Sequence, residues 1–221
     1  MQLTFLGHAC VVLRGSKTVV IDPFIPTGFP TDIKPDAVAL THAHADHTGE
    51  VKDLKTHVIC ANELALHLME EGLTAEPMNI GGTVIYEGVS YTMTWATHSS
   101  WMETKNGYIT GGSPAGFVIT MDNKTVYHAG DTGLFSDMRL IKELYRPDVA
   151  LLPIGGRYTM GVREAMMAAE FVGAKTVIPI HYNTFPQIEV TDEELLSFKT
   201  TIERTTDLSV NLLKPGESIE I

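Results

Sequence analysis

Residues 37–49 read AVALTHAHADHTG, and this stretch decides how the rest of the chain is interpreted. Residues 37–40 are apolar, as is typical of a short buried strand. Four potential metal ligands follow within six residues, in the pattern H-x-H-x-D-H: His42, His44, Asp46 and His47. Imidazole nitrogens and a carboxylate oxygen suit zinc and other borderline divalent ions. Because one ion cannot easily use all four groups, the pattern predicts two adjacent ions. The alternative is a polar loop with incidental histidines.

Three further apolar strands are expected to end near a metal-ligating side chain. Residues 91–96 run into His98, and residues 175–180 run into His181. A third strand ends shortly before Asp131, which lies between two glycines that let the backbone approach an ion closely. We therefore expect these three side chains to join the ligands of the first loop.

Five other polar residues are candidates for a role beside the metal ligands, and four of them also have a purely structural explanation. His8 and Asp22 interrupt or end apolar strands, so they either hydrogen-bond to loop backbone or orient the metal ligands and face substrate. His128 either supports the metal site or is a packed core histidine. Arg157 either pairs with a substrate anion or forms a surface salt bridge. Asn183, two residues after His181, is a further candidate for contact with ligands or substrate.

Length and composition indicate a soluble globular protein. The 221 residues suffice for one large domain or two small ones, and the 44% hydrophobic content supports a buried core. Two cysteines are too few for a disulfide framework, so an intracellular reducing compartment is expected. The N-terminus lacks the basic and apolar regions of a signal peptide, and no apolar run approaches the ~20 residues of a membrane span. A cytoplasmic location and no membrane partner are expected.

The formal net charge is −11. An acidic surface opposes attraction to nucleic acid, which normally needs a basic stripe, so a nucleic-acid partner is not expected. An anionic small-molecule substrate is still compatible with this charge, because two bound divalent ions would make the pocket locally positive. The sequence is compatible with a homo-oligomer and does not define the oligomeric state.

The hydrophobic pattern predicts strands in both halves of the chain, each set followed by alternating strands and helices. A faint internal similarity between the halves favours one two-layer domain over residues 1–221. The segment Ser99–Pro114, rich in glycine and polar residues, is expected to be a loop and a candidate lid over the site. Helices are expected at 48–54, 63–71, 135–145, 162–172 and 191–204, the last with a capping box formed by Thr191 and Glu194.

These residues resemble the metallo-β-lactamase superfamily. The family's metal motifs occur in the family's order between residues 42 and 181, and matching segments cover nearly the whole chain: LGHAC at 6–10, IDPF at 21–24, THAHADHTG at 41–49, HAGDTG at 128–133 and PIHYNTFP at 179–186. Within the superfamily the chain is similar to the branch that contains ascorbate-6-phosphate lactonase and small metal-dependent hydrolases. The resemblance implies a four-layer αββα sandwich with the metals at one edge of its two sheets.

The resemblance also implies how the ligands divide between two ions. His42, His44 and His98 would hold one ion, Asp46, His47 and His181 would hold the other, and Asp131 would bridge them. Zinc is the expected metal, and manganese and iron are compatible with the same ligands.

The functional hypothesis is metal-assisted hydrolysis of a small ester. A hydroxide bridging the two ions would form near neutral pH, because metal binding lowers the pKa of water from ~15.7 towards ~7. Asp46 would orient this hydroxide and later carry its proton, with Asp131 as the bridging carboxylate. The substrate is expected to be a lactone of a phosphorylated metabolite or a small phosphodiester.

Two rival hypotheses come from other functional classes. The first is a mononuclear iron oxidoreductase of the persulfide-dioxygenase type, in which Asp46 and His47 would surround the ion without binding it. The second is a metal-binding module without catalysis. Ala45 stands where the di-iron oxygen reductases of the superfamily have a glutamate, which argues against oxygen chemistry, and the chain lacks the inserted domain of the RNA-processing branch.

Overall fold

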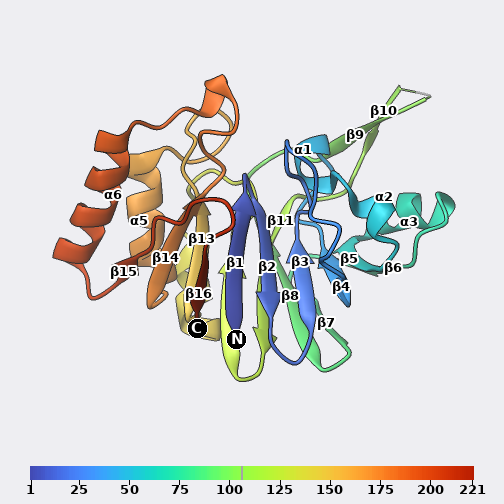
Figure 1. The fold of residues 1–221 in the computed structure, drawn as a ribbon, viewed down its shortest axis with the longest axis horizontal. Coiled ribbons are helices and arrows are strands. Elements are labelled where there is room, and N and C mark those ends of the chain that lie inside the picture. The colour runs from blue at the N-terminus through green and yellow to red at the C-terminus, as the bar shows by residue number, and fades with distance from the viewer. Residues whose placement is uncertain (106) are drawn as a thin grey trace.

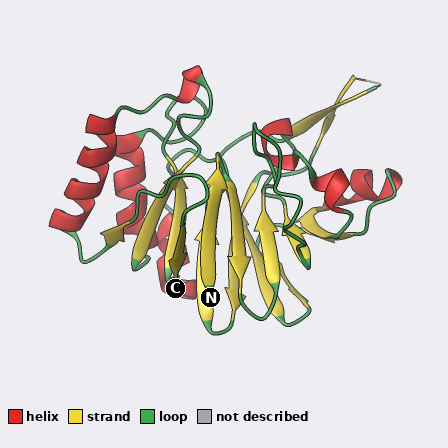
Figure 2. Ribbon diagram, in the orientation of Figure 1, coloured by secondary structure: helices red, strands yellow, loops and turns green. Residues whose placement is uncertain are grey.

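The structure is a computed structural model that describes residues 1–105 and 107–221. Two seven-stranded sheets pack face to face, and helices cover their outer faces (Figures 1 and 2). This arrangement confirms the αββα sandwich expected from the sequence. Within the described residues, no helix is both long and apolar enough to cross a membrane.

The first sheet has the strand order β16-β1-β2-β3-β4-β5-β6. Its strands are β1 (Gln2–Gly7), β2 (Cys10–Arg14), β3 (Thr18–Ile21), β4 (Ala37–Ala39), β5 (His57–Ala61), β6 (Ala75–Met78) and β16 (Ser218–Glu220). The short helices α1 (Ala45–Thr48) and α2 (Val51–Leu54) follow β4, and α3 (Asn62–Glu70) follows β5. The strands from β3 to β6 run parallel, and β1, β2 and β3 alternate in direction.

The second sheet has the strand order β15-β14-β13-β12-β11-β8-β7. Its strands are β7 (Thr83–Tyr86), β8 (Val89–Trp95), β11 (Ala115–Met121), β12 (Lys124–His128), β13 (Val149–Pro153), β14 (Thr176–Ile180) and β15 (Ser209–Val210). The helices on this side are α4 (Met138–Tyr145), α5 (Val162–Val172), the 3₁₀ helix η1 (Pro186–Ile188) and α6 (Asp192–Thr205).

Alternating side chains build the layers. On β2, Val11 and Leu13 face the second sheet and belong to the central core, whereas Cys10 and Val12 face outward and pack in one cluster with Leu64 and its neighbours on α3. This period of two is the property of a strand buried on both faces. Both cysteines of the chain are buried thiols. The outer face of the second sheet is covered in the same way by α4, α5 and α6.

Strand direction determines where the polar strand ends meet. The β8 strand is antiparallel to β11, and β11 is antiparallel to β12, so β8 ends at the same edge as the parallel strands β12 and β14. The same reasoning places the end of β1 beside the ends of β3 and β4 in the first sheet. A direct hydrogen bond joins the two edges, because the Ala115 N–H donates to the Thr41 carbonyl at 2.9 Å. All the strand-end candidates of the sequence therefore gather at one edge of the sandwich.

Three element predictions need correction. The segment Ser99–Pro114 is not an irregular loop, because it contains the hairpin β9 (Trp101–Thr104) and β10 (Gly107–Thr110); residue 106 lies outside the described residues. The expected helix at 48–54 is divided into α1 and α2 at Gly49, where a Cβ would lie 2.5 Å from the Pro23 carbonyl oxygen. The helix expected from residue 135 begins at Met138. The strand β6 was not predicted from the sequence.

The capping box at the start of α6 is confirmed and provides a stability prediction. The Glu194 N–H donates to Thr191 Oγ1 at 3.2 Å, and the Thr191 N–H donates to Glu194 Oε2 at 2.9 Å. We expect Thr191→Ala to lower the free energy of unfolding by about 1 kcal/mol, because a helix N–H group loses its partner. Urea unfolding followed by circular dichroism measures this change. Thr200→Ala, an exposed change inside the same helix, is the control, and an equal effect of both changes would contradict the capping role.

Candidate metal centre

The loop after β4 brings the first ligands together. His42 is buried just after the strand, and its Nε2 lies 3.0 Å from Nδ1 of His44. His98, beyond the end of β8 in the other sheet, lies against both rings at centroid distances of 5.1 and 5.2 Å. Each of the three histidines offers one nitrogen, and these nitrogens lie within 4.8 Å of one another. We call this trio, which could hold a metal ion, the first ligand group.

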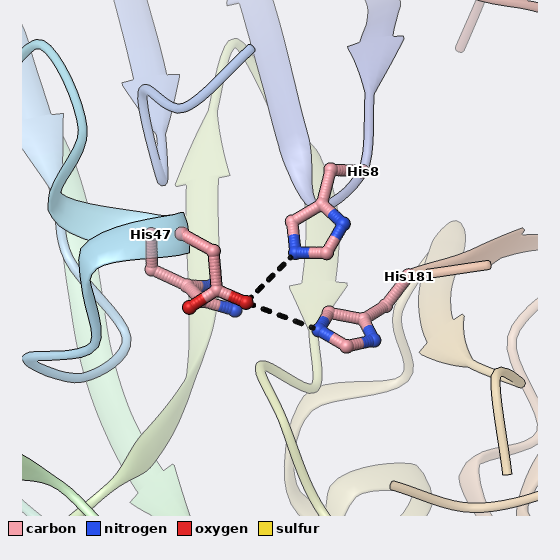
Figure 3. A group of neighbouring side chains, drawn as sticks. His8, His47 and His181 are labelled. Carbon is pink, nitrogen blue, oxygen red and sulfur yellow. Dashed lines mark hydrogen bonds and ion pairs between the residues drawn. The ribbon is translucent and has the colours of Figure 1, made fainter. Parts of the chain in front are cut away.

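A second ligand group lies beside the first. Asp46 and His47 come from α1, His8 from the end of β1 and His181 from the end of β14 (Figure 3). In Figure 3 His8 and His181 both face the same carboxylate oxygen, which is Oδ2 of Asp46, at 3.3 and 3.9 Å. One ligand atom from each of the four residues lies within 4.8 Å of the others.

Asp131 lies between the two groups. Its Oδ1 is 3.4 Å from Nε2 of His47, and its Oδ2 is 3.0 Å from Nε2 of His181 and 3.6 Å from Nε2 of His98. His42, His47 and Asp131 form a further cluster that spans the groups. One carboxylate therefore contacts histidines from both ligand groups.

The spacing and chemistry of these atoms fit metal ions. In a tetrahedral site with ligands at about 2.0–2.1 Å, neighbouring ligand atoms lie about 3.3–3.4 Å apart, close to the separations around Asp46 and Asp131. His47 Nε2, Asp131 Oδ1 and both ring nitrogens of His181 are buried without a hydrogen-bond partner of good geometry among the described residues. Such atoms are costly to leave unpaired. A cation among them would satisfy several at once.

Asp22 orients the ring of His47, a residue of the second group, through the ring nitrogen Nδ1. Its buried carboxylate accepts hydrogen bonds from the N–H and the hydroxyl of Thr41, at 2.8 and 2.7 Å, and from Nδ1 of His47 at 2.7 Å. With Nδ1 bonded to Asp22, the His47 ring directs its Nε2 at Asp131 and the centre. A carboxylate behind a metal-binding imidazole fixes its tautomer and orientation.

The pKa of His47 is raised, whereas the pKa values of His8, His42, His44 and His98 are lowered. Burial lowers the pKa of His42, His44 and His98, which favours the neutral imidazoles that bind metal. Burial opposes the charged forms of Asp131 and His47, but their mutual attraction holds the pKa of Asp131 well below its ordinary value and raises the pKa of His47. A metal ion must therefore displace a proton from His47.

A cavity of about 600 Å³ opens onto the centre. His44, Asp46, His98, Asp131 and His181 reach it. Its rim includes Trp101 from the β9–β10 hairpin and Tyr158 from the loop after β13, with Trp101 5.2 Å from the His44 ring. The site is therefore open to a small ligand and bordered by aromatic side chains. Trp101 belongs to the segment predicted as a candidate lid, whereas no role was predicted for Tyr158.

The remaining candidates lie outside the ligand groups. Both ring nitrogens of buried His128 are used by backbone, since Nε2 donates to the Ala9 carbonyl at 2.9 Å and Nδ1 accepts from the Gly130 N–H at 3.1 Å. The Asn183 side chain bonds twice to the backbone of Val190 and holds the loop after β14 together. Arg157 is exposed, with its guanidinium 5.6 Å over the ring of Tyr158.

Comparison with known proteins identifies the family of the chain. The sequence model of a beta-lactamase superfamily domain matches residues 18–182. The chain belongs to the metallo-β-lactamase superfamily. It is similar to a UPF0173 metal-dependent hydrolase of Methanospirillum hungatei, with 59% identity over all of this chain and 99% of the relative. A second such hydrolase, from Methanoculleus marisnigri, is 59% identical over all of this chain and 97% of its own.

Among solved structures, the chain is similar to Igni18, a metallo hydrolase from Ignicoccus hospitalis. The identity is 35%, the TM-score is 0.87, and the match covers 99% of this chain and 97% of Igni18. The fold is thus shared over nearly the full length of both chains. The superfamily assignment made from the metal motifs is confirmed.

Proposed function

We propose that the chain is a metal-dependent hydrolase with a dinuclear centre that cleaves a small ester. His42, His44 and His98 would hold one ion, Asp46, His47 and His181 the other, and Asp131 would bridge them. The observation that carries this proposal is the position of Asp131, whose two oxygens face histidines of both ligand groups. Two divalent ions held there, zinc being the first candidate, would lower the pKa of a shared water towards neutrality and polarise an acyl or phosphoryl oxygen.

The protein side chains would hold the ions in place, and Asp46 would exchange a proton with the attacking water. Asp46 is about one-third exposed and reaches the cavity, so its free oxygen can orient the attacking water and take up its proton. Burial opposes its charge, but the proximity of His8 and His47 holds the pKa of Asp46 below its ordinary value. Asp46 is therefore ionised at neutral pH, as both ligation and proton uptake require.

The substrate class follows from the charge and size of the cavity. An anionic group is compatible with two divalent cations at its floor. The aromatic rim of Trp101 and Tyr158 offers a flat apolar surface to the rest of the molecule. We therefore infer a lactone of a phosphorylated metabolite or a small phosphodiester. The names of the Methanospirillum and Methanoculleus relatives support hydrolysis and do not specify the bond.

Metal content tests the proposal directly. We expect close to two zinc or manganese ions per chain by elemental analysis of untagged protein purified without chelators. The same protein should hydrolyse a model lactone or bis(p-nitrophenyl) phosphate, lose this activity with a chelator and regain it with zinc. A single iron per chain, unchanged by His47→Ala, would contradict the two-ion centre and favour an iron oxidoreductase.

A further inference from the structure

His8 occupies an unusual position at the end of β1. It is 3% exposed, and its backbone φ of +53° is in the left-handed region that non-glycine residues rarely adopt. Its carbonyl accepts a hydrogen bond from the His181 N–H at 2.7 Å. His181, with a φ of +55°, has the same unusual backbone conformation. Such conformations persist where the surroundings enforce them, and they cluster at functional sites.

The ring of His8 is held on several sides. Its centroid lies 4.1 Å from that of the His181 ring, and the rings of Phe24 and Phe185 meet it edge-on at 5.5 and 5.6 Å. Its Nδ1 lies 3.0 Å from Oγ1 of Thr184. These contacts leave Nε2 as the ring nitrogen that faces the second ligand group (Figure 3).

Hydrogen bonding indicates which ring nitrogen carries the proton. The Thr184 hydroxyl donates to the Tyr182 carbonyl at 3.4 Å, so its oxygen accepts from Nδ1–H of His8. A neutral imidazole has one N–H, and Nε2 then presents a lone pair. This lone pair lies 3.3 Å from Oδ2 of Asp46, so two acceptors face each other. A cation between them would bind both.

We propose that Nε2 of His8 is a direct ligand of the ion held by Asp46, His47 and His181, and that Thr184 orients its ring. The four ligand atoms lie within 4.8 Å of one another. The 3.3 Å between His8 and Asp46 matches the about 3.3–3.4 Å between neighbouring ligands of a tetrahedral ion. A hydrogen bond from the other imidazole nitrogen to a protein acceptor is the usual arrangement behind a metal-binding histidine.

This inference rests on the proposed function, because it requires the second ion, and it adds an asymmetry to the centre. The second ion would have four protein ligands besides Asp131, and the first would have three histidines. With Asp131 included, the first ion would have four protein ligands and the second five, so the ion at His42, His44 and His98 would have more room for a substrate oxygen.

The test compares metal binding by the wild type, His8→Gln, His8→Ala and Thr184→Val. We expect both His8 variants to keep the first ion and to bind the second at least about 100-fold more weakly in chelator competition, with an altered visible spectrum of the cobalt form. Thr184→Val should lower the affinity for the second ion by about 10-fold, as expected for a residue that hydrogen-bonds to a metal ligand. His67→Gln is the control: His67 lies on the cavity wall outside the ligand groups, so this change should leave the affinity for both ions unchanged.

Three results would overturn the inference. The first is wild-type affinity for both ions in the His8 variants. The second is a low affinity for the second ion in His8→Ala together with wild-type affinity in His8→Gln. An amide can hydrogen-bond to Asp46 but is a poor replacement for an imidazole ligand, so this result would show that His8 acts through a hydrogen bond. The third needs no substitution: in cadmium-loaded, isotopically labelled wild type, the absence of a scalar coupling between the metal and His8 Nε2 would exclude ligation. A wild type that binds one ion would refute the proposed function itself, which separates the two failures.

Discussion

Asp131→Asn is expected to lower kcat for ester hydrolysis on the order of 10³-fold while the protein stays folded. The side chain keeps its shape but loses its charge, and one of its oxygens becomes an NH₂ group that faces histidine nitrogens of the ligand groups. Preorganised charge at the reacting centre is among the largest contributions to catalysis, and here the charge also holds two ions together. Steady-state kinetics on the model substrate cleaved by the wild type, with elemental analysis of the same samples, measures the effect.

The control for this change is Asp137→Asn, an exposed carboxylate just before α4 that lies outside the ligand groups. It should leave kcat and metal content unchanged. Circular dichroism and thermal unfolding of both variants show whether the fold is intact. Hydrolysis that survives Asp131→Asn undiminished in a folded protein would refute the bridging role.

Asp22→Asn is expected to lower the affinity for the second ion by about 10–100-fold, although Asp22 is not itself one of the proposed ligands. Its carboxylate accepts three hydrogen bonds, two from Thr41 and one from His47. An amide has one oxygen, so at least one of these donors would face an NH₂ group. Outer partners of metal-binding histidines typically contribute affinity of this size. Chelator competition for zinc measures the loss.

The same substitution should also lower the stability of the metal-free protein by about 1–3 kcal/mol, the cost of leaving a buried polar group unpaired. Unfolding in the presence of a chelator separates this effect from metal loss. Asp36→Asn is the matched control, because Asp36 also accepts a backbone N–H, from Thr18 at 2.7 Å, but is exposed and precedes β4, at the opposite end of that strand from the ligand loop. Wild-type zinc affinity in Asp22→Asn would show that the hydrogen bond between His47 Nδ1 and the Asp22 carboxylate does not contribute to metal binding.

Local sequence patterns determined the strand ends. An apolar run that stops at a polar side chain locates the end of a strand, and this property depends only on neighbouring residues. His42, His98, Asp131 and His181 could therefore be selected as ligand candidates from the sequence. The Thr191 capping box was predictable for the same reason, since its partners are three residues apart. The β9–β10 hairpin was missed because its two strands have only four residues each and are largely exposed, so no buried apolar run marks them.

The tertiary structure alone decided which of these side chains meet. The contacts of His8 with Thr184 and Asp46, and that of Asp22 with His47, join segments 25 to 176 residues apart. Their distances depend on strand direction in two sheets and on the packing of one sheet against the other, which no local pattern encodes. His128 shows the same limit, because only its contacts with the backbone of Ala9 and Gly130 separate a core histidine from a ligand. The sequence by itself identified the candidate ligands and the family, and the packing of the two sheets determined how those candidates are grouped.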